Sequence, residues 1–190
     1  MIYFLRHLET SHNELGLISG QYDSPISKNR IVNDGCNAVS KIQSVYSSPS
    51  KRCVETLRLI PELPVPPAAD RRLLERNMGE FENCSRQELY QCYPMFFKKI
   101  NGRISFRFEL TPPQSESFSD FRNRVASFCS EEILPYMEYN ILICSHNQTM
   151  KMIYFTLKGL SPTEGDWNTF AFPNGEVIAY PKVQELFARA

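Results

Sequence analysis

The sequence lacks an excess of charge of either sign. Its 190 residues include 21 Lys and Arg against 21 Asp and Glu, so the formal net charge at pH 7 is zero. Bulk nucleic-acid binding and polybasic membrane anchoring both depend on surplus positive charge. Apolar residues make up 42% of the chain, but no apolar stretch approaches the roughly 20 residues of a transmembrane helix. We therefore expect neither nucleic acid nor a membrane as a partner.

The chain also has few residues that bind metal ions. It contains three histidines and six cysteines, and no two cysteines form a C-x-x-C pair. Zinc sites usually need such pairs, so we expect no metal and no other cofactor. Because the strand-like run IYFL begins at residue 2, we expect no secretory leader. We expect a cytoplasmic protein whose thiols are reduced and mostly fill small core spaces.

Apolar runs and helical patterns alternate along the chain. Predicted strands cover 2–6, 44–48, 140–144 and 176–180, and predicted helices cover 27–42, 50–59, 85–93, 118–134 and 148–157. The stretches 9–26, 70–83 and 94–117 show no regular period. Alternating strands and helices predict a three-layer α/β/α fold around a mostly parallel sheet. The length fits one domain, residues 1–190, with 84–117 as a small inserted lid segment.

Three of the predicted strands end in groups that suit an anion. The first ends in Arg6-His7, the second is followed by Arg52 in the first turn of a helix, and the third is followed by His146. In an open α/β sheet, ligands bind at the carboxyl ends of the strands. If these strands are neighbours, two arginines and two imidazoles share one cleft.

Such a cluster suits a phosphate group. Each guanidinium can donate paired hydrogen bonds to phosphate oxygens. A neutral imidazole nitrogen can attack phosphorus and form a covalent intermediate that water later cleaves. A second imidazole, if protonated, can neutralise charge on the oxygens in the transition state. The reaction further needs an acid that protonates the leaving alkoxide.

Five segments carry a resemblance to one family. In chain order they are RHLETSHN (6–13), SSPSKRCVET (47–56), LLERNMGEFE (73–82), ESFSDFRNRV (116–125) and SHN (145–147). Together they resemble the motifs of the histidine phosphatase superfamily, which includes the phosphoglycerate mutases, and favour its phosphatase branch. They occur in the family order and span nearly the whole chain, which is far more specific than any single motif.

The resemblance implies a role for each matching residue. His7 is expected to become phosphorylated, and Glu75 to act first as the acid and then as the base that activates water. A further set is expected to bind the phosphoryl group or the substrate: Arg6, Asn13, Arg52, His146 and Asn147. Of this set, the two arginines and the histidine are also expected to take part in catalysis. The family needs no metal.

Three positions depart from the family pattern. Leu8 and Asn147 each replace the glycine that follows a motif histidine, and Ser115 replaces the glycine before Glu116. Glycine permits close backbone approach and unusual dihedral angles. We therefore expect Leu8 or Asn147 to narrow the pocket or to move the phosphate slightly. The choice of substrate should be affected more than the activity.

Other residues with chemical potential have simpler interpretations. His12 lies in a polar loop and is expected to be solvated, and Ser145 has no G-x-S-x-G elbow around it. Glu80 and Glu82 compete with Glu75 for the role of the acid. Glu75 is preferred because it matches the motif position.

The leading hypothesis is a metal-independent phosphomonoesterase that hydrolyses a small phosphorylated metabolite. The alternative is a phosphoglycerate mutase, but mutases of the family typically carry a longer insert between the acid and the second histidine. Here only the 70 residues 76–145 separate Glu75 from His146. A third hypothesis is a non-catalytic phosphoester-binding module, which would be expected to lose His7, Glu75 or His146. The natural substrate and the oligomeric state stay open.

The segment 84–117 contains a cluster of four cations: Lys98, Lys99, Arg103 and Arg107. One alternative is that they belong to an ordinary solvated loop. The other is that one or two of them bind a carboxylate or a second phosphate of the substrate, while nearby aromatic residues exclude water and strengthen the contact. The sequence leaves both alternatives open.

Overall fold

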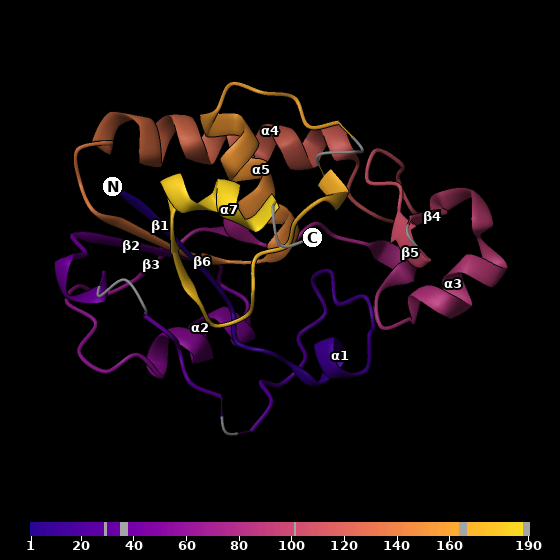
Figure 1. Cartoon of the computed structure of the whole chain (residues 1–190), viewed down its shortest axis with the longest axis horizontal. Helices are drawn as coiled ribbons and strands as arrows, with labels where there is room; N and C mark the ends of the chain where they lie inside the picture. Colours follow the sequence, from indigo (N-terminus) through magenta and orange to yellow (C-terminus); the bar gives the residue numbers. More distant parts are fainter. Residues whose placement is uncertain (29, 35–37, 101, 164–166, 188–190) are drawn as a thin grey trace.

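A five-stranded sheet forms the centre of the computed structural model, which describes residues 1–28, 30–34, 38–100, 102–163 and 167–187. The strands are β1 (Ile2–Arg6), β2 (Ser44–Ser47), β3 (Ala68–Ala69), β6 (Ile141–Ser145) and β7 (Val177–Ala179), in the order β3-β2-β6-β1-β7. All neighbouring strands run parallel except β1 and β7. The prediction of a mostly parallel sheet is therefore confirmed (Figure 1).

Helices cover both faces of this sheet. α4 (Phe118–Phe128) and α5 (Asn147–Leu157) lie on one face with α7 (Val183–Phe187) beside them, and α2 (Lys51–Arg58) lies on the other (Figure 1). Parallel strands need crossover connections, and the helices in these connections shield both faces of the sheet from water. The predicted three-layer architecture is confirmed.

Alternate residues of the central strands belong to two separate cores. Phe4 and Ile143 pack in the larger core with α4 and α5, whereas Leu5 and Leu142 pack in the smaller core with α2. All five residues of β6 are buried. Burial of one large apolar side chain contributes about 1.5–3 kcal/mol to the free energy of unfolding. The central strands are therefore firm supports for the groups at their carboxyl ends.

The remaining elements are short. α1 (Ser11–Glu14) and α3 (Arg86–Cys92) have one or two turns, and β4 (Phe97–Ile100) and β5 (Arg103–Phe106) form a separate antiparallel hairpin. The other short turns are η1 (Val39–Lys41), η2 (Arg71–Leu73), η3 (Gly79–Phe81), η4 (Pro94–Phe96), the π-helical η5 (Cys129–Ile133), η6 (Leu134–Tyr136) and η7 (Tyr180–Lys182). Among the helices described, none has the length and apolarity needed to cross a membrane.

The predicted helix at 27–42 is wrong. Of its described residues, only those of η1 form a helical turn, and Asp34 accepts hydrogen bonds from the backbone N–H groups of Ala38 and Val39 at its start. The backbone of Asn33 instead forms a bridge beside β7. Side chains of Asp and Asn compete with helical hydrogen bonds in this way. Part of the predicted range lies outside the described residues.

The expectation of irregular structure over 94–117 is also wrong, because the stretch contains the β4–β5 hairpin. Each strand has four residues, which is too short for a clear alternating pattern. Gly102 lies in the turn between them with a φ of +77°, a conformation that suits glycine. This hairpin matters for function because one of its strands borders the cavity described below.

The other helices follow the predictions closely. α2, α3 and α5 lie within two residues of the bounds predicted as 50–59, 85–93 and 148–157. A capping box marks the start of α3, as expected. The predicted helix 118–134 begins as α4, but its last residues pass into η5 and η6. The sequence patterns do not predict α1, β3 or α7, each of which has five residues or fewer.

Candidate active site

The carboxyl ends of β1, β6 and β2 lie side by side. Arg6 is paired with Ser145 across β1 and β6, and Ser47 is paired with Cys144 across β2 and β6. The backbone N–H of His7 continues this ladder by donating to Ser145 O at 3.1 Å. The register therefore brings the residues that follow the three strands to one place, as the sequence predicts.

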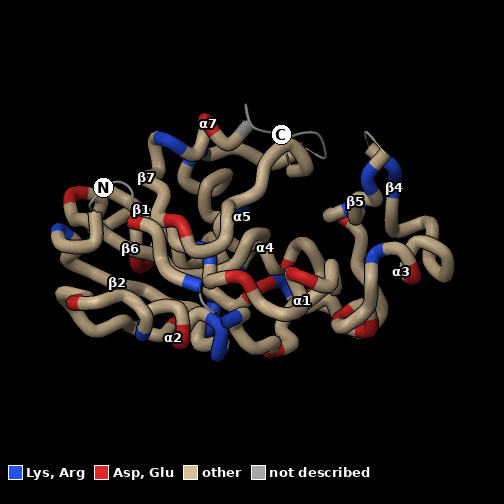
Figure 2. Tube along the Cα trace, turned by 60° about the horizontal axis from the view of Figure 1, so that its bottom comes forward, with Lys and Arg blue, Asp and Glu red and all other residues tan. Residues whose placement is uncertain are grey.

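Basic positions gather at this edge and across from it. Figure 2 shows Lys and Arg positions close together where β1 ends near α1 and α2, and others on the β4–β5 hairpin and beside α3. A cavity of about 450 Å³ takes lining residues from both regions. We call Arg6, His7, Arg52 and Glu75 the strand-end wall, and Arg86, Arg103, Ile104, Ser105 and Phe106 the outer wall.

His7 reaches the cavity as a neutral imidazole. Its Nδ1 donates to the carbonyl oxygen of Leu8 at 2.7 Å, since a carbonyl can only accept. Burial, followed by the charges of Arg6 and Arg52, holds the pKa of His7 well below its usual value. Nε2 therefore carries a free lone pair near neutral pH, and this is the form of imidazole that can attack phosphorus.

His146 lies behind the cavity, with both ring nitrogens engaged. Nδ1 accepts a hydrogen bond from Arg52 Nε (3.2 Å), and Nε2 donates to Ser48 Oγ (2.9 Å). Its ring centroid lies 5.3 Å from that of His7. Burial, followed by the charge of Arg52, holds the pKa of His146 well below its usual value. The ring is therefore neutral and orients Arg52 instead of supplying charge itself.

The two arginines differ in the donors that they leave for a ligand. Arg52 is buried and donates to the carbonyl oxygens of Tyr22 (2.6 Å) and Gly20 (2.7 Å). Arg6 donates from Nη1 to Phe172 O (2.8 Å), but its buried Nε has no acceptor among the described residues. Desolvation lowers the pKa of Arg6 to about 10, so the guanidinium stays charged near neutral pH. A bound anion would provide the missing acceptor.

The Glu75 carboxylate is held at the N-terminus of α5. Oε2 accepts from the backbone N–H of Gln148 (3.1 Å), and Oε1 accepts from both the backbone N–H and the hydroxyl of Thr149 (3.1 Å each). Arg124 fixes the surrounding chain by donating to the carbonyl oxygens of Leu74 (2.9 Å) and Glu75 (3.1 Å). The first N–H groups of a helix lack partners within the helix, and here they position a carboxylate at the cavity.

The competing carboxylates face elsewhere. Glu80 accepts a hydrogen bond from the side-chain amide of Gln114 (2.8 Å), and Glu82 accepts from the backbone N–H of Gln21 (2.9 Å). Neither residue lines the cavity, whereas Glu75 does. The geometry therefore favours Glu75 among the three carboxylates.

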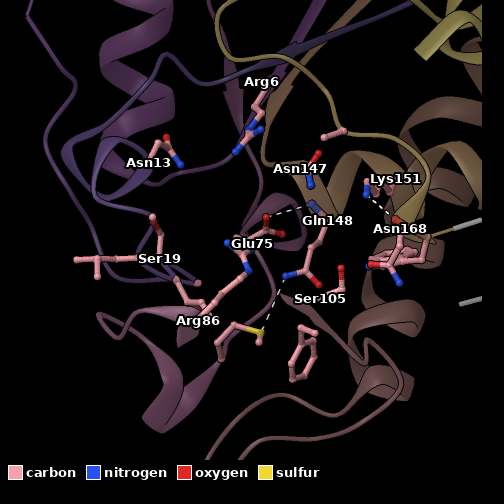
Figure 3. Close-up of a pocket in the computed structure, with 18 of the residues that line it drawn as sticks. Arg6, Asn13, Ser19, Glu75, Arg86, Ser105, Asn147, Gln148, Lys151 and Asn168 are labelled. Atoms are coloured by element: carbon pink, nitrogen blue, oxygen red, sulfur yellow. Dashed lines mark hydrogen bonds between the residues drawn. The ribbon is translucent and has the colours of Figure 1, made fainter. Parts of the chain in front are cut away.

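Two asparagine side chains border the cavity beside Arg6 (Figure 3). Asn13 Oδ1 accepts from the backbone N–H of Thr10 (3.1 Å) within the capping box of α1. Asn147 Oδ1 accepts from the backbone N–H of Phe172 (2.9 Å). Neither amide nitrogen donates to another described residue, so both can donate to a ligand.

The residues that replace family glycines do not all affect the cavity. Leu8 is 2% exposed and packs against Gly175, where an added Cβ would lie 2.6 Å from Leu8 Cδ2. Ser115 lies against Gly79, away from the cavity. The expectation that Leu8 narrows the pocket is wrong, because Leu8 does not line it. Asn147 does line it.

His12 is buried, which corrects the expectation that it is solvated. It is 6% exposed, and its ring stacks on that of Tyr22 with 4.8 Å between centroids. The capping box at Thr10 begins a helical turn within the predicted loop, and this turn directs His12 inward. His12 thus supports Tyr22, whose carbonyl oxygen holds Arg52.

The four cations of the predicted lid do not act as one group. Arg103 lines the cavity, whereas Lys98, Lys99 and Arg107 do not. The ammonium group of Lys99 instead lies over the Tyr90 ring, 5.5 Å from its centroid. The alternative of an ordinary surface loop therefore fits three of the four.

Sequence reasoning missed six polar residues of the cavity: Ser19, Arg86, Ser105, Gln148, Lys151 and Asn168 (Figure 3). Lys151 could have been found from the sequence. It lies in a predicted helix, four residues after Asn147, and residues at that spacing share a helix face. Arg86 is the first residue of a helix that the sequence predicts, but nothing in the pattern shows which way it points. Asn168 lies in a stretch with no pattern at all.

Buried thiols fill the cores, as the sequence predicts. Cys53, Cys129 and Cys144 are free and buried. In the part of the chain that the structure describes, no three His, Cys, Asp or Glu side chains are grouped so as to hold a metal ion.

Known proteins resemble this chain over most of its length. A Hydrogenobacter thermophilus protein, provisionally named phosphoserine phosphatase 2, is 28% identical over 88% of this chain and 82% of its own. The 2,3-bisphosphoglycerate-dependent phosphoglycerate mutase 2 of Gloeobacter violaceus is 27% identical over 86% of this chain and 78% of its own. The crystal structure of a provisionally named α-ribazole-5′-phosphate phosphatase of Escherichia coli matches with a TM-score of 0.72 and 25% identity, over 92% of this chain and 86% of that one.

The model of one protein family covers nearly the whole chain. The histidine phosphatase superfamily (branch 1) matches residues 2–180. That range contains all five motif segments and every residue of both cavity walls. The chain belongs to the histidine phosphatase superfamily, branch 1.

Proposed function

We propose that the protein is a phosphomonoesterase that transfers the phosphoryl group of a small metabolite first to His7 and then to water. One observation carries the proposal. The hydrogen bond from His7 Nδ1 to Leu8 O leaves an unprotonated Nε2 in a cavity that Arg6, Arg52 and Glu75 also line. Hydrolysis of a phosphate monoester needs a nucleophile, groups that stabilise charge, and an acid. Membership of the family, and relatives named as phosphatases, support an enzyme of the phosphoric monoester hydrolase class.

The first step forms a bond between phosphorus and nitrogen. Arg6 and Arg52 hold the phosphate oxygens while His7 Nε2 attacks phosphorus. The bond from phosphorus to the ester oxygen breaks, and its electron pair goes to that oxygen. Glu75, protonated for this step, gives the oxygen a proton, and the alcohol leaves. The hydrogen bond from Nδ1 to Leu8 O stabilises the positive charge on the phosphohistidine ring.

The second step restores the enzyme. Glu75, now a carboxylate, takes a proton from water, and the water oxygen attacks phosphorus. The phosphorus–nitrogen bond breaks and its electron pair returns to Nε2, so phosphate is released and His7 is neutral again. The two backbone N–H groups that hold the Glu75 carboxylate at the cavity support its use in both steps.

Arginine charge supplies the electrostatic stabilisation that a metal ion supplies in many other phosphatases. Arg6 has a buried N–H without a protein acceptor, and Arg52 is held in place by His146 and by two carbonyl oxygens. His146 is then a positioning residue, because it acts through Arg52. The proposal accordingly includes activity without added metal.

We also propose that residues 84–117 act as a substrate lid within a single domain, 1–190. Arg86, Arg103 and Phe106 of this segment line the cavity across from the strand-end wall. Such a segment excludes water and adds contacts to the leaving group. A cytoplasmic setting with small phosphorylated metabolites fits the free thiols of the chain.

A phosphoglycerate mutase reaction is the second candidate, favoured by the similarity to the Gloeobacter violaceus enzyme. A mutase has to protect phosphohistidine from water until phosphoglycerate accepts the group. The 70 residues between Glu75 and His146 offer little material for that protection. A pure binding module is less favoured still, because His7 and Glu75 both border the cavity.

A trapping experiment tests the proposal. The protein is mixed with an aryl phosphate labelled at phosphorus, in a buffer with a chelator, and is quenched during turnover. We expect a protein-bound label that is labile in acid and stable in base, together with release of free phosphate. His7→Ala should lose the label and about 10³-fold or more of the activity, while its thermal unfolding stays cooperative.

Three results would count against the proposal in different ways. Full activity in His7→Ala removes the nucleophile assignment. Loss of activity with the chelator, restored by magnesium, contradicts the use of arginine charge alone. Isomerisation of phosphoglycerate that outpaces phosphate release favours the mutase.

A further inference from the structure

Lys151 is a buried cation at the cavity that the proposed mechanism does not use. It lies in α5 one turn after Asn147, is 5% exposed and lines the cavity. Nζ donates to Trp167 O at 2.6 Å and lies 4.9 Å from the centroid of the Phe170 ring. An ammonium group has three N–H donors. The carbonyl satisfies one, so two have no hydrogen-bond acceptor in the part of the chain that the structure describes.

Among the residues that the structure describes, no carboxylate contacts the Lys151 ammonium group. Its contacts there are a carbonyl oxygen and the rings of Trp167 and Phe170. Burial, followed by the charge of Arg6 on β1, lowers the pKa of Lys151 to about 7; Arg86 on α3 adds to this shift, and Glu75 opposes it. A buried charge without a partner of opposite sign is costly. An anionic ligand would remove that cost.

Glu75 and Lys151 are held by one helix, about one turn apart. The Glu75 carboxylate accepts from Gln148 and Thr149 in the first turn of α5, and Lys151 belongs to the next turn. One turn rises about 5.4 Å, and helical side chains lean toward the N-terminus, here toward Glu75. Figure 3 shows Lys151 beyond Asn147, on the side away from Arg6. A leaving group whose ester oxygen meets Glu75 therefore extends toward Nζ.

We propose that Lys151 binds a carboxylate on the leaving group, two or three carbons from the ester oxygen, and so selects phosphorylated acids over their uncharged analogues. The inference rests on the proposed phosphatase function. A single ammonium group flanked by two aromatic rings matches the one charge of a carboxylate. A second phosphate dianion carries two charges, of which one ammonium group balances only one. Lys151 is thus assigned a role in the choice of substrate. It lies in α5, the helix that also positions the acid Glu75.

The test compares two phosphates that differ in one group. 3-Phosphoglycerate carries a carboxylate where glycerol 3-phosphate carries a hydroxymethyl group. The measured quantity is the ratio of kcat/KM for 3-phosphoglycerate to kcat/KM for glycerol 3-phosphate. Lys151→Met removes the charge but keeps most of the apolar stem, and should lower this ratio on the order of 10- to 100-fold. Lys158→Met, at the exposed end of the same helix, is the matched control and should keep the wild-type ratio.

The wild-type protein gives a second readout that needs no variant to fold. Ionisation of the phosphate, His7 and Glu75 affects both substrates alike and cancels in the ratio. Lys151 is charged below its pKa of about 7 and neutral above it, so the ratio should fall as the pH rises through that value. Lys151→Arg stays charged across this range, and its ratio should not change with pH. A lysine that only anchors Trp167 would show neither effect.

The outcomes separate this inference from the function on which it rests. An unchanged ratio in Lys151→Met, or a wild-type ratio that is constant across neutral pH, overturns the role of Lys151 while hydrolysis stands. Failure to hydrolyse any phosphate ester overturns the proposed function itself. If both substrates react too slowly, the ratio of their inhibition constants against hydrolysis of an aryl phosphate replaces the ratio of kcat/KM, with the same expected directions.

Discussion

The strand-end wall and the outer wall border the same cavity, but different interactions hold them in place. The strand-end wall begins where the backbone ladder of a parallel sheet ends, with Arg6 in register with Ser145. The outer wall is carried by α3 and by a hairpin of two four-residue strands, which contact the rest of the molecule through side chains such as Phe81 and Phe97. The residues proposed for the chemical steps therefore lie at the edge of the sheet that forms the centre of the fold, whereas the outer wall depends mainly on side-chain packing.

One buried arginine joins the two regions. Arg76 follows Glu75 in the chain and is completely buried. Its guanidinium donates to the carbonyl oxygens of Phe108 and Leu110, beyond the hairpin, and of Glu116. Desolvation lowers its pKa to about 10, which leaves it charged at neutral pH. The segment that carries the outer wall is thus tied to the residue next to the proposed acid.

Among substitutions in the strand-end wall, replacement of the acid Glu75 is expected to cause the largest loss of activity after that of His7. Glu75→Gln can neither protonate the leaving oxygen nor activate water, so kcat should fall on the order of 10²- to 10⁴-fold. The loss should be greater for alkyl phosphates than for aryl phosphates, which have good leaving groups. Steady-state rates on both classes measure this, with Glu80→Gln as the matched control. If Glu80→Gln shows that dependence on the leaving group and Glu75→Gln does not, the role moves to Glu80.

A smaller loss, about 10- to 100-fold, is expected when His146 is changed to Gln, because Arg52 loses the acceptor that orients its Nε. If His146 acts through Arg52, the two residues are not independent. The double variant with Arg52→Met should then lose little more than Arg52→Met alone. A double-mutant cycle on kcat/KM measures the coupling. Strictly additive losses would show that His146 contacts the phosphate on its own account.

Much of the strand-end wall could be predicted from the sequence because three of its four residues lie at the end of a regular strand or at the start of a regular helix. Arg6 and His7 end an apolar run, and Arg52 stands in the first turn of a helix that follows a strand. Parallel strands end at a common edge, so position along the chain is enough to bring such groups together. Glu75 needed its motif, because 70–83 has no period, and the structure adds the donors that hold it.

The rest could not be predicted, because it depends on how side chains of irregular segments pack. Arg103 reaches the cavity while Lys99, four residues earlier in the same hairpin, turns to a tyrosine ring. His12 is buried by a single helical turn inside a polar stretch. In such segments one hydrogen bond decides the local course of the chain. Neither the composition of a segment nor its hydrophobic period shows which hydrogen bond forms.

Acid should lower the free energy of unfolding through three buried histidines. Burial is the main cause that lowers the pKa values of His7, His12 and His146. Above the ordinary pKa of about 6.5 these rings are neutral in both the folded and the unfolded chain. Below it, only the unfolded chain takes up protons readily. The free energy of unfolding should then fall by up to about 1.4 kcal/mol per pH unit for each such histidine.

Urea unfolding of the wild type and of His7→Gln at neutral pH and at mildly acidic pH measures this effect. The variant lacks one of the three groups, so it should lose less stability on acidification than the wild type. The comparison uses differences within each protein, so any constant change in stability caused by the substitution cancels. Equal losses in the two proteins would show that His7 titrates normally in the folded state.

The smallest change in activity is expected for a substitution in the outer wall, Arg103→Ala. Arg103 is exposed on β5 and lines the cavity, so solvent screens its attraction for a substrate anion to about 0.2–1 kcal/mol. Arg103→Ala should therefore lower the ratio of kcat/KM for 3-phosphoglycerate to glycerol 3-phosphate by only about two- to fivefold. Lys99→Ala, in the same hairpin but outside the lining, is the matched control.

Added salt should remove the contribution of exposed Arg103 to this ratio and spare that of buried Lys151, because screening acts mainly on exposed charges. Equal, salt-independent effects of Arg103→Ala and Lys99→Ala would leave the hairpin cations as ordinary surface charge, with selectivity resting on α5 alone.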